Sequence, residues 1–195
     1  MVDLKNHNSR QWKIILGGSG GQGIVTMGRI LAYAGVIKKL NVSFLPAYGA
    51  EMRGGYVHSM LSLSTGELVS PVISQADYGV FLNESSMQLL SQYLKEDAWI
   101  LWNSSLIKPA RRNKNHDIGI PASEIAEKLG SIKIANMVML GALLKILKKS
   151  SFPISEKEVE TSIKHVMGEN KKNSTLNFRA FSEGIKLVEE VMKNV

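Results

Sequence analysis

The sequence predicts an α/β protein with three layers (α/β/α), a mainly parallel sheet, a Rossmann-like first βαβ unit and a helical C-terminal layer. Two observations carry this prediction. Up to Ile120, apolar runs of strand length alternate with segments whose apolar residues recur at helical spacing, which is typical of βαβ units. Beyond Ile120, the apolar residues follow helical spacing alone.

The expected elements of the α/β part alternate along the chain. Strands are expected at residues 13–16, 42–45, 58–64, 78–82, 98–102 and 117–120. Helices are expected between them at residues 22–37 and 85–94, where apolar residues recur every three or four positions. Pro46 is expected to end the second strand, because proline has no N–H group to donate to a sheet.

Three helical patterns fill the C-terminal third. Residues 134–147 are apolar around most of the helix circumference, so this helix is expected to be buried. We expect the helix at residues 134–147 to pack in the core of this chain rather than to contact another subunit. Ser155 and Glu158 form a capping box that opens a helix toward Met167. A last amphipathic helix is expected at about residues 176–192.

The composition is that of a globular protein. Hydrophobic residues make up 44% and charged residues 21% of the 195 residues. No apolar run reaches the roughly 18 residues of a membrane span, and residues 1–11, expected to be a flexible arm, have no apolar stretch typical of a secretory signal. We therefore expect one domain over residues 12–195, a cytoplasmic location and no contact with a membrane.

The charged and metal-ligating residues exclude several function classes. The chain has no cysteine, so it cannot ligate an ordinary iron–sulfur cluster or use a thiolate nucleophile. Its four histidines are scattered without metal-ligand spacing, and no metal site is expected. The net charge of +7 comes from helix ends and loops without interleaved aromatics. This pattern argues against nucleic-acid binding and is compatible with an anionic small ligand or an acidic partner protein.

The first candidate site is a glycine-rich turn after the first expected strand. Gly18, Gly20 and Gly23 match the G-x-G-x-x-G spacing, and Gly21 and Gln22 complete the turn. Glycines at such a turn let a ligand approach the backbone, and the N–H groups of the following helix N-terminus attract anions. No Gly-Lys-Ser/Thr sequence follows, so the turn is not a P-loop. We expect it to bind the anionic part of a cofactor.

The second candidate site is another glycine-rich turn, at residues 46–55. It contains Tyr48, Glu51 and Arg53, and ends in Gly54 and Gly55. Because it follows the next strand, both turns are expected to leave the same edge of the sheet. Glu51 and Arg53 either brace the turn through charge-assisted hydrogen bonds or form a rim that contacts a ligand or a partner subunit.

The residues leave two other functions open. One is a free-standing Rossmann-type NAD(P)-binding oxidoreductase, and the other is a nucleotide-binding regulatory domain. A Rossmann NAD site has an acidic residue at the end of the second strand to bind the ribose. Residues 43–48 contain neither Asp nor Glu, which argues against the first alternative.

Four segments together resemble the gamma subunit of 2-oxoacid:ferredoxin oxidoreductases, the family that acts on pyruvate, 2-oxoglutarate or ketoisovalerate. These segments are residues 17–25 (GGSGGQGIV), 46–55 (PAYGAEMRGG), 135–142 (ANMVMLGA) and 177–184 (NFRAFSEG). The small subunit of indolepyruvate oxidoreductase is similar, so the resemblance does not define the substrate. It extends over nearly the whole chain.

The resemblance implies a subunit of an enzyme complex, inactive when isolated and without catalytic residues of its own. Such complexes oxidatively decarboxylate a 2-oxoacid with coenzyme A, yielding an acyl-CoA, CO2 and reduced ferredoxin. It implies alpha and beta, and in some complexes delta, subunits as partners, which hold thiamine diphosphate, Mg and the iron–sulfur clusters. Ferredoxin is reached through the complex. We expect the coenzyme A phosphates near residues 20–23 with Arg53 as counter-charge, and we allow for a homodimer of the isolated chain.

Overall fold

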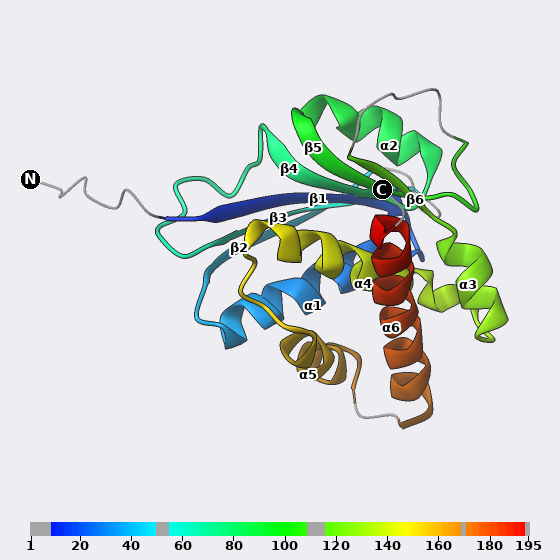
Figure 1. Ribbon diagram of the computed structural model, residues 1–195. Helices are drawn as coiled ribbons and strands as arrows, with labels where there is room; N and C mark the ends of the chain where they lie inside the picture. Colours follow the sequence, from blue (N-terminus) through cyan, green and yellow to red (C-terminus); the bar gives the residue numbers. More distant parts are fainter. Residues whose placement is uncertain (1–8, 50–54, 109–115, 169–170, 194–195) are drawn as a thin grey trace, which may run out of the picture.

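A computed structural model describes residues 9–49, 55–108, 116–168 and 171–193. Its centre is a six-stranded sheet in the order β2-β3-β1-β4-β5-β6 (Figure 1). The strands are β1 (Gln11–Ser19), β2 (Asn41–Tyr48), β3 (Tyr56–Ser64), β4 (Ala76–Phe81), β5 (Leu94–Asn103) and β6 (Asp117–Ile120). β1, β4, β5 and β6 pair in parallel, whereas β3 is antiparallel to both β1 and β2. The mainly parallel sheet is confirmed.

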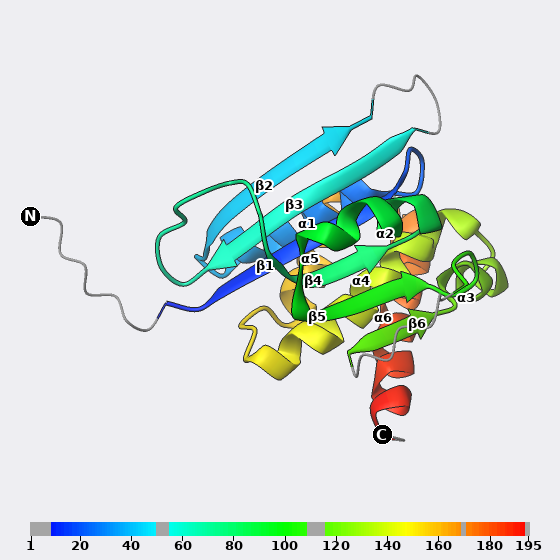
Figure 2. The same cartoon turned by 90° about the horizontal axis from the view of Figure 1, so that it is seen from above.

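Helices cover both faces of the sheet unequally (Figures 1 and 2). On one face lie α1 (Ile24–Ile37) and α4 (Ala135–Leu147), with α5 (Glu156–Met167) and α6 (Lys171–Lys193) packed outside them. The other face carries α2 (Glu84–Leu90), and α3 (Ala122–Lys128) follows β6. Short 3₁₀ turns are η1 (Ser91–Tyr93), η2 (Ile132–Ile134) and η3 (Lys148–Ser150). The three-layer α/β/α class with a helical C-terminal layer is confirmed.

β2 has the same direction as β1, because β3 is antiparallel to both. β1, α1 and β2 are the expected first βαβ unit, with β3 lying between its two strands. The carboxyl ends of β1, β2, β4, β5 and β6 therefore meet at one edge of the sheet, which we name the carboxyl edge. Both glycine-rich turns leave from it, as the sequence predicted.

The prediction that β2 ends at Pro46 is wrong, because β2 continues to Tyr48. Gly49 N–H donates to the Tyr56 carbonyl across the hairpin at 2.6 Å. Since hydrogen-bonded pairs alternate along an antiparallel ladder, Pro46 falls at a position whose backbone faces away from β3. A proline there costs no ladder bond, which is why prolines occur in edge strands.

Other element ends also differ from the prediction. β1 continues through Gly17 and Gly18, because its long antiparallel pairing with β3 supports these glycines. α2 ends at Leu90, and β5 already begins at Leu94, within the segment expected to be helical. α3 was missed because its sequence ASEIAEK has little apolar periodicity. α6 begins at Lys171, before the expected start.

Glycines allow α4 and α6 to cross closely. Every residue of α4 except Lys145 is buried, so the prediction of a core helix is confirmed. A Cβ atom at Gly141 would overlap the Phe181 carbonyl oxygen, and one at Gly184 would overlap the Val138 carbonyl oxygen. The sequence segments 135–142 and 177–184 therefore lie on two helices that pack against each other, one segment on each side of the contact.

α5 is attached to α1 by polar and aromatic contacts. The predicted capping box is present: the Glu158 carboxylate accepts hydrogen bonds from the Ser155 N–H (2.7 Å) and the Ser155 hydroxyl. Glu158 also pairs with Lys38 at the end of α1, with 3.4 Å between Nζ and Oε1. The rings of Tyr33 and His165 stack with centroids 3.9 Å apart. Hydrogen bonds from Ser155, with a further one from Lys38, lower the pKa of Glu158 to about 2.

Glu158→Gln is expected to lower the free energy of unfolding by about 1 kcal/mol at pH 7, the usual contribution of a helix cap. The folded pKa of about 2 is below the ordinary value of 4.5. The stabilisation is therefore complete above pH 4.5 and is lost as the pH falls toward 2. Urea unfolding of both proteins across this pH range measures it. A gap between the two proteins that stays constant from pH 7 to pH 2.5 would contradict the assigned pKa.

None of the helices in the described part of the chain is long and apolar enough to cross a bilayer.

Candidate functional site

The first glycine turn connects β1 to α1 at the carboxyl edge. Gly21 and Gly23 have positive φ angles of 91° and 75°, a conformation that favours glycine. Gly23 is the residue before α1, and its carbonyl accepts the Met27 N–H. The first turn of α1 has no side-chain cap and no acidic residue. Among the described residues, no acidic side chain caps or neutralises the helix N-terminus in which this turn ends.

The first backbone N–H groups of α1 border a cavity of about 300 Å³. Ile24, Val25 and Thr26 line it, and their N–H groups have no hydrogen-bond partner among the described residues. Tyr48, with 68% of its side chain exposed, lies across the cavity at the end of β2. Free N–H groups at a helix N-terminus attract phosphate and carboxylate groups. Anion binding is therefore the chemistry that this cavity offers.

Gln22 bridges the ends of β1 and β4 on the other side of the turn. Its Oε1 accepts the Ser19 N–H at 2.7 Å, and its Nε2 donates to the Leu82 carbonyl at 3.4 Å. Asn83, which caps α2, donates to the Ser19 hydroxyl. α1 and α2 pack on opposite faces of the sheet, so β1 and β4 flank the point where open α/β sheets usually bind ligands. The Gln22 amide bridges the ends of β1 and β4 at that point.

A further cavity of about 210 Å³ lies beyond Gln22, toward the ends of β5 and β6. Asn103 and Ser123 border it, and Asn103 Nδ2 donates to Ser123 Oγ at 2.8 Å. Among the described residues that line it, Lys133 is the charged one. Gln22 lines this cavity but not the cavity at the first turn of α1.

The two glycine turns are in direct contact. Gly20 N–H donates to the Gly55 carbonyl at 2.9 Å, which joins the turns at their bases. Tyr48 and Gly55 are thus placed beside Gly20 and Gly21, as the sequence predicted from strand order. Glu51, Arg53 and Gly54 lie outside the described residues.

Sequence reasoning did not select Thr26, Asn83 or Asn136 for this site. Asn136 is buried on α4, and its Nδ2 donates to the Gly23 carbonyl at 3.2 Å. It connects the start of α4 to the start of α1. Asn136 could have been noticed as an amide at the start of a largely apolar helical segment. Nothing in the sequence around Asn83 or Thr26 distinguishes these two residues.

Tyr56 and His58 contribute no charge beside the second turn at neutral pH. Their rings lie 5.1 Å apart on β3. Burial, with a smaller effect from Tyr93, raises the pKa of Tyr56 to about 12. Burial also lowers the pKa of His58. Both side chains are therefore neutral near pH 7.

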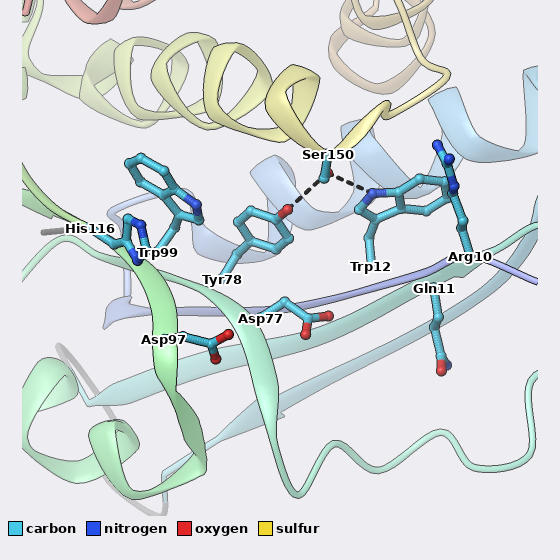
Figure 3. Close-up of a pocket in the computed structure, with 9 residues that line it drawn as sticks. All are labelled: Arg10, Gln11, Trp12, Asp77, Tyr78, Asp97, Trp99, His116 and Ser150. Atoms are coloured by element: carbon cyan, nitrogen blue, oxygen red, sulfur yellow. Dashed lines mark hydrogen bonds between the residues drawn. The ribbon is translucent and has the colours of Figure 1, made fainter. Parts of the chain in front are cut away.

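A larger cavity of about 440 Å³ lies at the opposite edge of the sheet (Figure 3). Trp12 Nε1 and the Tyr78 hydroxyl both donate to Ser150 Oγ, at 2.8 and 2.9 Å, and Ser150 donates to the Leu147 carbonyl. Asp77 points to the other side of the sheet, where it pairs with Lys95 and accepts the Lys13 N–H. Because Trp12, Tyr78 and Ser150 bond to one another, this side of the cavity is a structural junction that holds the end of α4 to β1 and β4.

Ser150→Ala is expected to destabilise the protein by about 1–3 kcal/mol, because two buried donors lose their shared acceptor. Urea unfolding followed by circular dichroism measures the change. Ser85→Ala, at an exposed position on α2, is the control and is expected to stay within about 0.5 kcal/mol of the parent protein. Equal stability of Ser150→Ala and the parent protein would refute the structural role.

No group of three or more metal-ligating side chains is present among the described residues that would hold a metal ion.

Comparisons with known proteins place these features in a family. Residues 13–187 match the family model described as pyruvate ferredoxin/flavodoxin oxidoreductase. The ketoisovalerate oxidoreductase subunit VorA of Methanothermobacter marburgensis is 31% identical over 137 residues, which are 70% of this chain and 29% of VorA. The 2-oxoglutarate synthase subunit KorC of Archaeoglobus fulgidus is 28% identical over 185 residues, covering 94% of this chain and 91% of KorC. The chain thus spans about a third of VorA but nearly all of KorC.

Solved structures have the same fold. The keto/oxoacid ferredoxin oxidoreductase gamma subunit of Geobacter sulfurreducens superposes with a TM-score of 0.76 at 25% identity, over 92% of this chain and 99% of that one. A chain of the 2-oxoglutarate:ferredoxin oxidoreductase of Magnetococcus marinus gives 0.81 at 24% identity, over 93% of this chain and 31% of that one. The family model spans most of the chain, including both glycine turns and the α4–α6 crossing. The chain therefore belongs to the pyruvate ferredoxin/flavodoxin oxidoreductase family.

Proposed function

We propose that this chain is the gamma subunit of a 2-oxoacid:ferredoxin oxidoreductase complex. The complex would oxidatively decarboxylate a 2-oxoacid with coenzyme A, giving an acyl-CoA, CO2 and reduced ferredoxin. The similarity along nearly the whole of the Geobacter gamma subunit and of KorC supports a unit of this type. The longer VorA and Magnetococcus chains are compatible with the same unit fused to other parts of such an enzyme.

The redox chemistry would belong to the partner subunits. An iron–sulfur cluster needs cysteine ligands, and this chain has none. The alpha and beta subunits, with a delta subunit in some complexes, would hold thiamine diphosphate, Mg and the clusters. This chain would bind and orient coenzyme A as the co-substrate that accepts the acyl group.

The observation that carries this role is the open first turn of α1. Its N–H groups border a cavity of about 300 Å³ whose described lining residues include no carboxylate, which suits a phosphate of coenzyme A. Residues 20–23 would approach the phosphate through their backbone, and Tyr48 would bound the site on the β2 side. Arg53 would supply the counter-charge. The Gln22 amide, which is bonded to Ser19 and Leu82 across the ends of β1 and β4, argues against a dinucleotide placed between these strands, as in a Rossmann dehydrogenase.

Anaerobic affinity purification from the native cells tests the assignment. We expect a brown complex whose other chains carry thiamine-diphosphate and cysteine-rich cluster motifs, identified by mass spectrometry. Assays with several 2-oxoacids and coenzyme A then identify the substrate. A colourless protein without stoichiometric partners would refute the subunit assignment, and tight NADPH binding by it would favour the nucleotide-binding alternatives.

A further inference from the structure

The two margins of the sheet differ in how they are protected. β6 is four residues long and begins with the charged Asp117. β2 is eight residues long and has no charged side chain, and Figure 2 shows it as the outer strand on its side of the sheet. Exposed edge strands are usually shortened or given charges, because their free backbone groups invite pairing with another strand. β2 is neither short nor charged, and the protective residue it does contain is Pro46, which removes a single N–H from the outer edge.

The hydrogen-bond pattern identifies the free backbone groups of β2. Gly20 pairs with Gly55, so the odd-numbered residues of β3 bond to β1 and the even-numbered ones bond to β2. The bond from Gly49 to Tyr56 agrees with this alternation. On β2, the backbones of Val42, Phe44, Pro46 and Tyr48 therefore face outward. None of these four has another hydrogen-bond partner among the described segments.

We propose that a second copy of this chain pairs with β2 in an antiparallel ladder, forming a homodimer with a continuous sheet. The two-fold axis passes beside Leu45. In this register Val42 lies opposite the second copy's Tyr48, and Phe44 lies opposite the second copy's Pro46. Every ladder bond forms except the one that the missing Pro46 N–H would donate in each copy. The outward positions are symmetric about Leu45, so the strand is complementary to itself.

Charge and exposure favour a second copy in this orientation. Lys38 and Lys39 lie just before β2, with Leu40 between them and the strand, and an antiparallel ladder separates the two lysine pairs to opposite ends. The strand itself brings no charge into the contact. Leu45 is 39% exposed at the centre of the strand, and the axis places it against the same residue of the second copy. This contact buries apolar surface that is exposed in the monomer.

The absence of cysteine in the natural sequence allows a direct test on the full chain. The axis makes position 45 a non-hydrogen-bonded pair with itself, where Cα atoms lie about 4.5 Å apart, within the range of a disulfide. Leu45→Cys, oxidised with copper phenanthroline, is expected to give a covalent dimer on a non-reducing gel. Val69→Cys, at a 99% exposed position on a loop, is the matched control and is expected to stay largely monomeric.

A second measurement addresses the dimer without a covalent link. Light scattering across a dilution series is expected to show dimers for the parent chain and for Val69→Lys, and monomers for Leu45→Lys. A parent chain that is monomeric throughout would overturn the proposal. Equal cross-linking of Leu45→Cys and Val69→Cys would also overturn it. Neither result bears on the proposed enzymatic function, which the purified complex tests separately.

Discussion

Gly184→Ala is expected to lower the free energy of unfolding by about 3 kcal/mol or more, at the upper end of the usual cost of overpacking a core. The added Cβ would meet the Val138 carbonyl of α4, which is backbone and can yield only if the two helices separate. Helix propensity alone predicts the opposite sign, since alanine in a helix is favoured over glycine by about 1 kcal/mol. A loss of stability in Gly184→Ala would therefore show that helix packing outweighs helix propensity at this position, and a gain would show the reverse.

Urea unfolding of Gly184→Ala and Gly141→Ala measures this effect. Gly141 makes the reciprocal contact with the Phe181 carbonyl, so both variants are expected to lose stability. Glu190→Ala, at an exposed position of the same helix, is the control and is expected to change by less than about 0.5 kcal/mol. Stabilisation by either glycine replacement would contradict the close crossing of α4 and α6.

Thr26→Asp is expected to raise the KM for coenzyme A of the assembled complex by about tenfold or more, equivalent to about 1.4 kcal/mol. The new carboxylate would stand in the first turn of α1, on the cavity proposed to hold a phosphate, where like charges repel. The same carboxylate interacts favourably with the helix dipole, by about 0.3–1 kcal/mol. Binding and stability are thus expected to change in opposite directions.

Steady-state kinetics of the complex and urea unfolding of the isolated chain give the two quantities. Thr26→Asn is the matched control, because it has the size of aspartate without the charge. We expect its KM for coenzyme A to stay within a fewfold of the parent value. An unchanged KM in Thr26→Asp, with the variant incorporated in the complex, would place the coenzyme A phosphate elsewhere.

The number and order of the long elements could be predicted from the sequence, because burial of one face imposes a period on apolar residues. Their ends could not. Gly17, Gly18 and Pro46 are unfavourable in an isolated strand, yet all three lie within strands. Long pairing with β3 supports the two glycines, and the outward-facing edge position accommodates the proline. Such outcomes depend on which neighbour a strand acquires.

The candidate site could be predicted in part. The glycine spacing predicted an anion-binding turn, and the order of strands predicted that residues 46–55 would lie beside it. Which side of the turn is open could not be predicted. It depends on Gln22 folding back onto Ser19 and Leu82, and on Asn136 reaching Gly23 from α4. Leu82 is far from Gln22 along the chain, and Gly23 is far from Asn136. The contact between Gln22 and Ser19 depends on the backbone conformation of the turn, which its glycines do not restrict.

The sequence by itself determined the α/β class, the two glycine turns at one edge, the capping box of α5 and the lack of thiolate ligands. Each of these follows from composition or from spacing within a short segment. Only the tertiary structure decided that Gln22 bridges the ends of β1 and β4, that the first turn of α1 opens toward Tyr48, and that α4 and α6 cross closely at Gly141 and Gly184. The physical reason is that each of these depends on the distance between backbones brought together by folding, which no local pattern of residues encodes.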